Sequence, residues 1–157
     1  RVVMTVFTKF VIAGLALATS IAAAVPAFAQ DVTHSTPGLS GYDPVAYFTE
    51  GKPMRGSGYH VAVQDGVTYA FASAEHKKLF IANPQQYLPA YGGYCAYGVA
   101  AGKKFVADPE VWKVLDGTLY LNLDKNIQGK WEKDIPGYIT KANSNWSEIK
   151  DKAPDAL

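Results

Sequence analysis

The candidate ligands for a soft metal ion in this chain are its one cysteine, two of its three histidines and one of its two methionines. Cys95 is the only cysteine and offers a thiolate, His60 and His76 offer imidazoles, and Met54 offers a thioether. Thiolate and thioether ligands favour Cu(I), whereas imidazole binds both copper and zinc. No two of these residues have a short diagnostic spacing such as Cys-x-x-Cys. Any metal site would therefore be assembled only by the fold.

Each candidate ligand also has an ordinary structural interpretation. Free cysteine is usually a small buried hydrophobe, and Cys95 fits that description as well as a ligand. His60 could be a strand residue facing solvent, and His76 could be a helix residue that bonds to the backbone. Residue types alone leave both interpretations open.

Catalytic motifs are absent from the sequence. It contains no Gly-x-Ser-x-Gly, no phosphate-binding Gly-x4-Gly-Lys-Ser/Thr and no His-Glu-x-x-His. A thiol enzyme would need Cys95 as nucleophile with His60 or His76 as its base. The sequence supplies no third group to orient that base, so we expect no enzymatic activity.

Tyrosines surround the single cysteine. Tyr91, Tyr94 and Tyr97 lie within four residues of Cys95. Tyrosine can line a small-molecule pocket and orient a ligand with its hydroxyl group, although it is more often found at the rim of a core. A metal-free module that binds a ligand or a protein through a tyrosine-rich surface is the main alternative to metal binding.

The N-terminus has the features of a cleavable export signal. Arg1 and Lys9 precede an apolar stretch over 10–24, and Ala27-Phe28-Ala29 is a small-x-small cleavage site. We expect a signal peptide over 1–29, a mature chain that begins at Gln30, and a periplasmic or secreted location. The apolar stretch is short for a membrane span, which needs about 20 residues. We therefore expect no membrane contact after cleavage.

The charge balance excludes polyanion binding. The chain has 15 basic and 14 acidic residues, and removing a segment with two bases and no acid leaves 13 and 14. A near-neutral surface without a basic cluster gives no footprint for nucleic acid. No partner other than a metal ion is indicated, and the protein partner stays unknown.

Turn and cap residues predict a small α+β domain. Asp65-Gly66 and Asp116-Gly117 each separate two β-rich runs and predict two hairpins. About three helices are expected: one from an N-cap at Ser73, one from Asn122 towards Trp131, and one from Pro136. Hairpins with helices between and after them favour α+β over parallel α/β. We expect a flexible lead-in over 30–40, one domain over 41–149, a tail over 150–157 and no internal repeat.

An ordered set of motifs resembles the YHS domain. Its members are Asp43-Pro44-Val45, Gly66–Ser73, Phe80 and Asn83–Tyr87, extended by Gly41–Phe48, Tyr91–Ala96, Asp116–Asn122 and Trp146. The set covers nearly all of 40–149 and is similar to exported single-domain bacterial proteins of that family. The resemblance implies a YHS-like α+β fold.

The resemblance also bears on metal binding. YHS domains occur in copper-transporting ATPases and are suspected of binding metal through two cysteines. The positions where such cysteines are expected hold Ala46, Ala72 and His76 in this chain. We therefore expect a transition-metal site, copper ahead of zinc, with Cys95 and His76 as ligands and His60 as the third.

Overall fold

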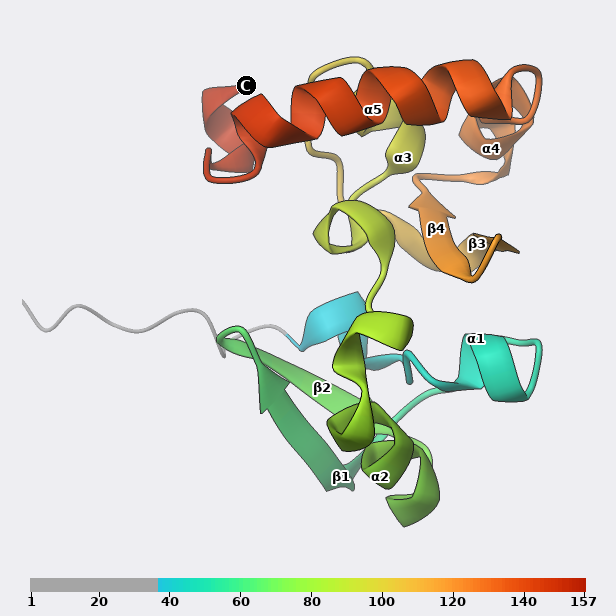
Figure 1. The fold of residues 1–157 in the computed structure, drawn as a ribbon, viewed down its shortest axis with the longest axis vertical. Coiled ribbons are helices and arrows are strands. Elements are labelled where there is room, and N and C mark those ends of the chain that lie inside the picture. Colours follow the sequence, from blue (N-terminus) through green and yellow to red (C-terminus); the bar gives the residue numbers. More distant parts are fainter. Residues whose placement is uncertain (1–36) are drawn as a thin grey trace, which may run out of the picture. The chain divides into compact units, whose positions relative to one another are not determined.

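A computed structural model of the chain describes residues 37–157. The predicted signal peptide and the start of the lead-in lie outside these residues. Within them the chain is a small α+β domain with five α-helices and two antiparallel two-stranded sheets, as Figure 1 shows. The helices are α1 (Ala46–Thr49), α2 (Ala74–Ala82), α3 (Ala96–Ala100), α4 (Lys125–Trp131) and α5 (Ile135–Ile149). The strands are β1 (Ser57–Gln64), β2 (Val67–Phe71), β3 (Asp108–Leu115) and β4 (Thr118–Asn122). In this part of the chain no helix is both long and apolar enough to span a membrane.

Both predicted hairpins are confirmed, and their turns explain why. β1 pairs with β2 and β3 with β4, each across an Asp-Gly dipeptide. Asp65 and Gly66 have φ of 50° and 76°, and Asp116 and Gly117 have 48° and 74°. Two consecutive positive φ angles define a type I′ turn, whose twist matches that of the flanking strands.

The helix boundaries follow side-chain caps, with two differences from expectation. Ser73 accepts a hydrogen bond from the His76 N–H at 3.1 Å, as predicted for the N-cap of α2. α4 is capped by Asp124 rather than by Asn122, because the Asn122 side chain is buried in the domain. The expected number of helices was too low, because α1 and α3 have only four and five residues.

The described chain is built from two copies of one supersecondary unit, so the expectation of no internal repeat was wrong. A 3-10 turn, a short helix, a hairpin and a capped helix follow in the same order over residues 37–83 (the first repeat) and 89–134 (the second repeat). In the first hairpin Ser57 pairs with Phe71 and, after a bulge, Val61 pairs with Ala70. The second hairpin has the same bulge and the same register 51 positions later, from Asp108 with Asn122 to Trp112 with Leu121.

The backbone before each short helix repeats as well. The 3-10 turns η2 (Gly38–Gly41) and η4 (Ala90–Gly93) each end with three consecutive residues of positive φ. The Asp43 N–H donates to the Met54 carbonyl, and the Cys95 N–H donates to the Phe105 carbonyl. Identical residues at equivalent positions are few: Pro37/Pro89, Gly41/Gly93, Tyr42/Tyr94, Gly51/Gly102, Lys52/Lys103, Val63/Val114, Asp65/Asp116, Gly66/Gly117 and Tyr69/Tyr120. Most of them serve turns, which is why the duplication is hard to detect in the sequence.

Each repeat has its own core, and a third cluster lies between the two cores. We call this third cluster the junction cluster; its buried members are Tyr47, Cys95, Ala107, Leu119 and Leu121. Tyr69 packs on Phe80 at 5.3 Å between ring centroids in the first repeat, and the equivalent pair Tyr120 and Trp131 packs at 5.6 Å in the second. α5 has no counterpart in the first repeat and lies along α3 (Figure 1). Between the repeats, Tyr47 of α1 packs edge-on against Trp112 of β3.

The ordered core extends past the expected domain boundaries of 41 and 149. Leu39 of η2 packs against the core of the first repeat and against the junction cluster. Leu157 packs against the core of the second repeat. These contacts bring the ends of the described chain into the folded domain.

Candidate functional site

Cys95 is a structural residue in the fold. Its side chain is fully buried between the two repeats, beside Tyr47, Leu119 and Leu121. The sulfur accepts a hydrogen bond from the Gly98 N–H at 3.4 Å, which caps α3, and donates to Asn122 Oδ1 at 3.6 Å. These bonds and the burial of the side chain agree with the interpretation of Cys95 as a small buried hydrophobe, which the sequence left open.

His76, in the first turn of α2, bonds to a buried carboxylate. Its Nδ1 lies 2.6 Å from Oδ2 of Asp43, a fully buried carboxylate. The same carboxylate accepts the N–H groups of Val45 and Ala72, both at 2.8 Å. Because the Asp43 carboxylate can only accept hydrogen bonds, Nδ1 is the donor, and this bond fixes the ring orientation.

The other ring nitrogen of His76 meets the end of α1. Nε2 lies 3.3 Å from Thr49 Oγ1 and 3.5 Å from Glu50 Oε1. The His76 side chain is 11% exposed and that of Glu50 is 44% exposed. A histidine that binds a metal ion through one ring nitrogen commonly donates to a carboxylate through the other. In His76, Nδ1 has such a carboxylate, and the side-chain oxygen atoms of Thr49 and Glu50 lie near Nε2.

The three predicted metal ligands do not meet in one site. Cys95 bonds to Asn122 and Gly98, and His76 bonds to Asp43 at the end of α1. His60 lies half-buried on β1. Within residues 37–157, no group of three or more His, Cys, Asp or Glu side chains is arranged to hold a metal ion. Metal binding therefore stays a prediction.

The duplication places the predicted ligand Cys95 at the position equivalent to Asp43, which is the hydrogen-bond partner of the other predicted ligand, His76. Asp43 in the first repeat and Cys95 in the second occupy equivalent positions, and so do His76 and Ile127. The first repeat therefore carries a polar pair where the second has a thiol beside the apolar junction cluster that includes Ile127.

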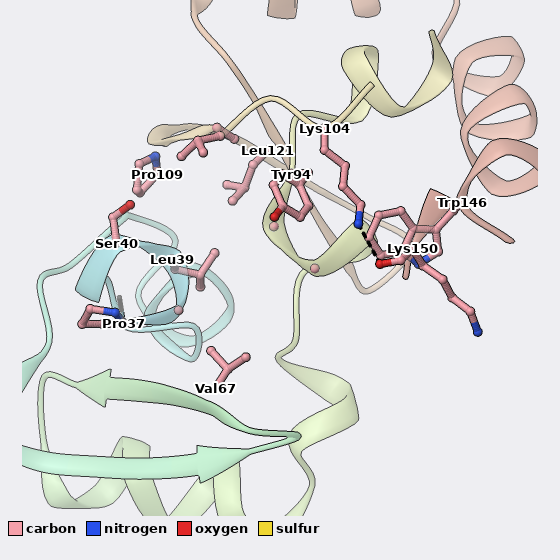
Figure 2. Close-up of a pocket in the computed structure, with 15 residues that line it drawn as sticks. Pro37, Leu39, Ser40, Val67, Tyr94, Lys104, Pro109, Leu121, Trp146 and Lys150 are labelled. Carbon is pink, nitrogen blue, oxygen red and sulfur yellow. Dashed lines mark hydrogen bonds between the residues drawn. The ribbon is translucent and has the colours of Figure 1, made fainter. Parts of the chain in front are cut away.

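A hollow of the described chain lies between the two repeats. It has a volume of about 590 Å3 and is lined by Leu39, Ser40 and Val67 of the first repeat and by Tyr94 of the second. In Figure 2, Leu39, Ser40 and Val67 lie on one side of the hollow, and Tyr94 lies beside Trp146 of α5 on the other. A neighbouring hollow of about 400 Å3 shares Val67, Gly92 and Trp146 with it. We call the two hollows together the inter-repeat cleft.

Two lysines are the only charged side chains that line the larger hollow. Lys104 donates a hydrogen bond to the carbonyl oxygen of Lys150 at 2.7 Å, just past the end of α5 (Figure 2). It donates a second bond to the carbonyl oxygen of Lys152 at 2.6 Å. Its ammonium group also lies 5.4 Å from the ring centroid of Tyr94 and 5.3 Å from that of Trp146. Burial lowers the pKa of Lys104, because desolvation disfavours its charged form. The larger hollow is thus an apolar and aromatic site with a positive end.

Sequence reasoning identified only part of this cleft. Tyr94 was predicted as a possible ligand-binding residue, whereas Lys104 and Lys150 were not singled out. Trp146 entered only through the YHS resemblance. No sequence signal connects these positions, because they come together through the packing of α5 and the junction of the repeats.

Searches among protein families, curated proteins and solved structures found no match to this chain. The resemblance to the YHS domain stays a prediction, and the family of the chain is not assigned.

Proposed function

We propose that this domain is a non-catalytic binding module that holds an elongated, mainly apolar anion in the inter-repeat cleft. The observation that carries the proposal is the pairing, in the larger hollow, of an apolar, aromatic lining with Lys104 and Lys150 as its only charged side chains. Asp65 lines the smaller hollow. No carboxylate lines the larger hollow to neutralise them. An anionic group at the lysine end with an apolar body against Trp146 and Val67 is the chemistry that fits.

The size and composition of the cleft support a small-molecule ligand. Ligand pockets commonly have volumes of roughly 300–1,000 Å3 and combine an apolar lining with a few polar groups that set orientation. The larger hollow lies within that range, at about 590 Å3. A lysine ammonium has three N–H donors, and two of those on Lys104 bond to carbonyl oxygens. The third is available to an anion.

A titration with three amphiphiles tests the proposal. Sodium dodecanoate, dodecanol and dodecyltrimethylammonium share a chain length and differ in head-group charge. Calorimetry below their micelle concentrations should rank binding in that order, since only the carboxylate pairs with the lysines. Equal binding of the cationic and anionic compounds, or no binding of either, would contradict the proposal.

Two variants locate the binding site. Lys150→Gln removes one exposed charge from the cleft and should weaken dodecanoate binding roughly three- to fivefold, in keeping with about 1 kcal/mol for an exposed ion pair. Lys141, an exposed lysine of α5, does not line the cleft, so Lys141→Gln is the matched control and should leave the affinity unchanged. If both substitutions weaken dodecanoate binding equally, only the net charge of the protein affects the affinity, and Lys150 has no specific role in the cleft.

A second candidate function is transition-metal binding at His76, with copper ahead of zinc as the resemblance implies. The observation in its favour is that Asp43 holds the imidazole through Nδ1 while Glu50 and Thr49 lie beside Nε2. Imidazole and carboxylate ligands suit Zn2+ or Cu2+, whereas the predicted thiolate of Cys95 would favour Cu(I).

Competition against metal chelators separates the two versions of the metal site. Loss of Cu(I) binding in Cys95→Ser would support the predicted thiolate site, which would require the buried sulfur to open. Loss of Zn2+ or Cu2+ binding in His76→Ala and Glu50→Gln, with Cys95→Ser unaffected, would support the His76 site. Affinity of all variants equal to wild type would reject both.

A further inference from the structure

The outer face of the first hairpin is apolar and exposed. Val61 and Val63 of β1 are 39% and 59% exposed, and they alternate with half-buried Ala62 and Gln64. Tyr59, which precedes them in the same strand, is 94% exposed. Within the described residues, β1 pairs only with β2, so its second edge has no strand partner.

The equivalent face of the second hairpin is covered. Trp112 and Val114 occupy the positions of Val61 and Val63, and both pack into the junction cluster. Tyr47 of α1 lies against Trp112 with 5.3 Å between ring centroids. The same surface of one repeated unit is therefore buried in one copy and open in the other.

The two equivalent edge strands, β1 and β3, also differ in how well their residues prevent pairing with a strand of another chain. β3 carries Pro109, Glu110 and Lys113, and prolines and charges are the devices that keep an edge strand from pairing with another chain. β1 contains no Pro, Asp, Glu, Lys or Arg over its eight residues. An uncharged, exposed edge strand with apolar side chains is a template for strand addition.

We propose that β1 is a self-association edge through which two copies of this chain form a dimer. Antiparallel pairing of identical strands is two-fold symmetric, the commonest symmetry of soluble homo-oligomers. With Val61 opposite Val61 of the second copy, Tyr59 lies opposite Val63, and all three side chains share one face. No like charges meet at this interface, because β1 has none.

The dimer is expected to be weak. One strand pair with three large apolar side chains on each partner is smaller than the standard interface of roughly 1,600 Å2. We expect dissociation in the micromolar range, detectable as a rise of weight-average mass with concentration. Sedimentation equilibrium of the mature chain from about 5 to 500 µM measures this directly.

Charge substitutions test the role of β1. Val61→Lys places like charges face to face across the proposed pair, and Val63→Lys places a charge against Tyr59 of the second copy. Each substitution should keep the protein monomeric over the whole range. Ile81→Lys is the matched control, because Ile81 is also an exposed aliphatic residue, at 60%, and lies on α2 outside the strand. Monomeric wild-type protein at the highest concentration would overturn the proposal, as would an equal loss of dimer in Ile81→Lys.

Cross-linking provides a second readout that does not depend on the stability of the charged variants. A cysteine at the centre of a symmetric antiparallel pair faces its own copy at a Cα distance suited to a disulfide. Val61→Cys should therefore form a disulfide dimer under mild oxidation. Val63→Cys, which faces Tyr59 of the second copy, and Lys78→Cys on the exposed face of α2 should not. Native Cys95 is buried and does not compete. Equal cross-linking at all three positions would show random collision and reject the proposed edge.

Discussion

Replacing Asp43 by alanine should destabilise the domain severely. The Asp43 carboxylate is fully buried and accepts hydrogen bonds from the Val45 N–H, the Ala72 N–H and His76 Nδ1. Hydrogen bonds to a charged group contribute about 1.5–3 kcal/mol each, and a buried donor left unpaired costs about 1–3 kcal/mol. Because these contributions are not additive, we expect a total loss of about 3–5 kcal/mol, the usual cost of breaking a buried pair.

The second repeat supplies the matched control. Cys95 occupies the position equivalent to Asp43 and is equally buried, but its sulfur accepts one bond, from the Gly98 N–H at 3.4 Å. Cys95→Ala should cost about 1–2 kcal/mol, from a small cavity and a weak bond. His76→Ala leaves both backbone bonds of Asp43 in place and should also cost less than Asp43→Ala.

Thermal and urea unfolding followed by circular dichroism measure these differences. At about 4 °C per kcal/mol for a domain of this size, Asp43→Ala should lower the unfolding midpoint by roughly 12–20 °C. Cys95→Ala should lower it by roughly 4–8 °C. Equal midpoints for the two variants would refute the view that the Asp43 carboxylate organises the first repeat.

Four further outcomes are expected. Gly117→Val should cost about 1 kcal/mol or more in urea unfolding, because φ at Gly117 is 74° and a β-branched residue resists that region. Burial raises the pKa of the Tyr69 phenol to about 12, so the folded state keeps a proton that the unfolded chain loses above about pH 10. The free energy of unfolding should therefore fall as pH rises from 10 to 12, and Tyr69→Phe should flatten that decline. Lys104→Met removes the donor to two carbonyl oxygens at the end of α5 and should speed amide exchange in its last turn, roughly tenfold for about 1.4 kcal/mol. The intact mass of envelope-derived protein should match Gln30–Leu157, and a mass that includes residues 10–24 would contradict cleavage.

Local features of the fold could be predicted from the sequence. The Asp-Gly turns need positive φ at both residues, which few other dipeptides provide, so both hairpins were located correctly. The cap at Ser73 was correct for the same reason, since a short polar side chain before a helix has few other roles. Asn122 was assigned as a cap and is a buried strand residue, because nothing local separates the two roles.

Features that depend on long-range packing could not be predicted. α1 and α3 are too short to show a helical period and are held by their surroundings. The duplication is hidden because equivalent positions have opposite chemistry, as with Asp43 and Cys95. Val67 and Trp146 line the same cleft although they are far apart in the sequence, and no spacing along the chain indicates that they come together.

Mapping of dodecanoate binding by NMR tests the central claim most directly. Amide spectra of the labelled mature chain should show saturable shifts concentrated at Val67, Gly92 and Gly93, which line the cleft. Val67→Glu, which places a carboxylate in both hollows, should abolish those shifts while leaving the rest of the spectrum folded. Shifts confined to the exposed face of β1, or no saturable shifts at all, would contradict the account.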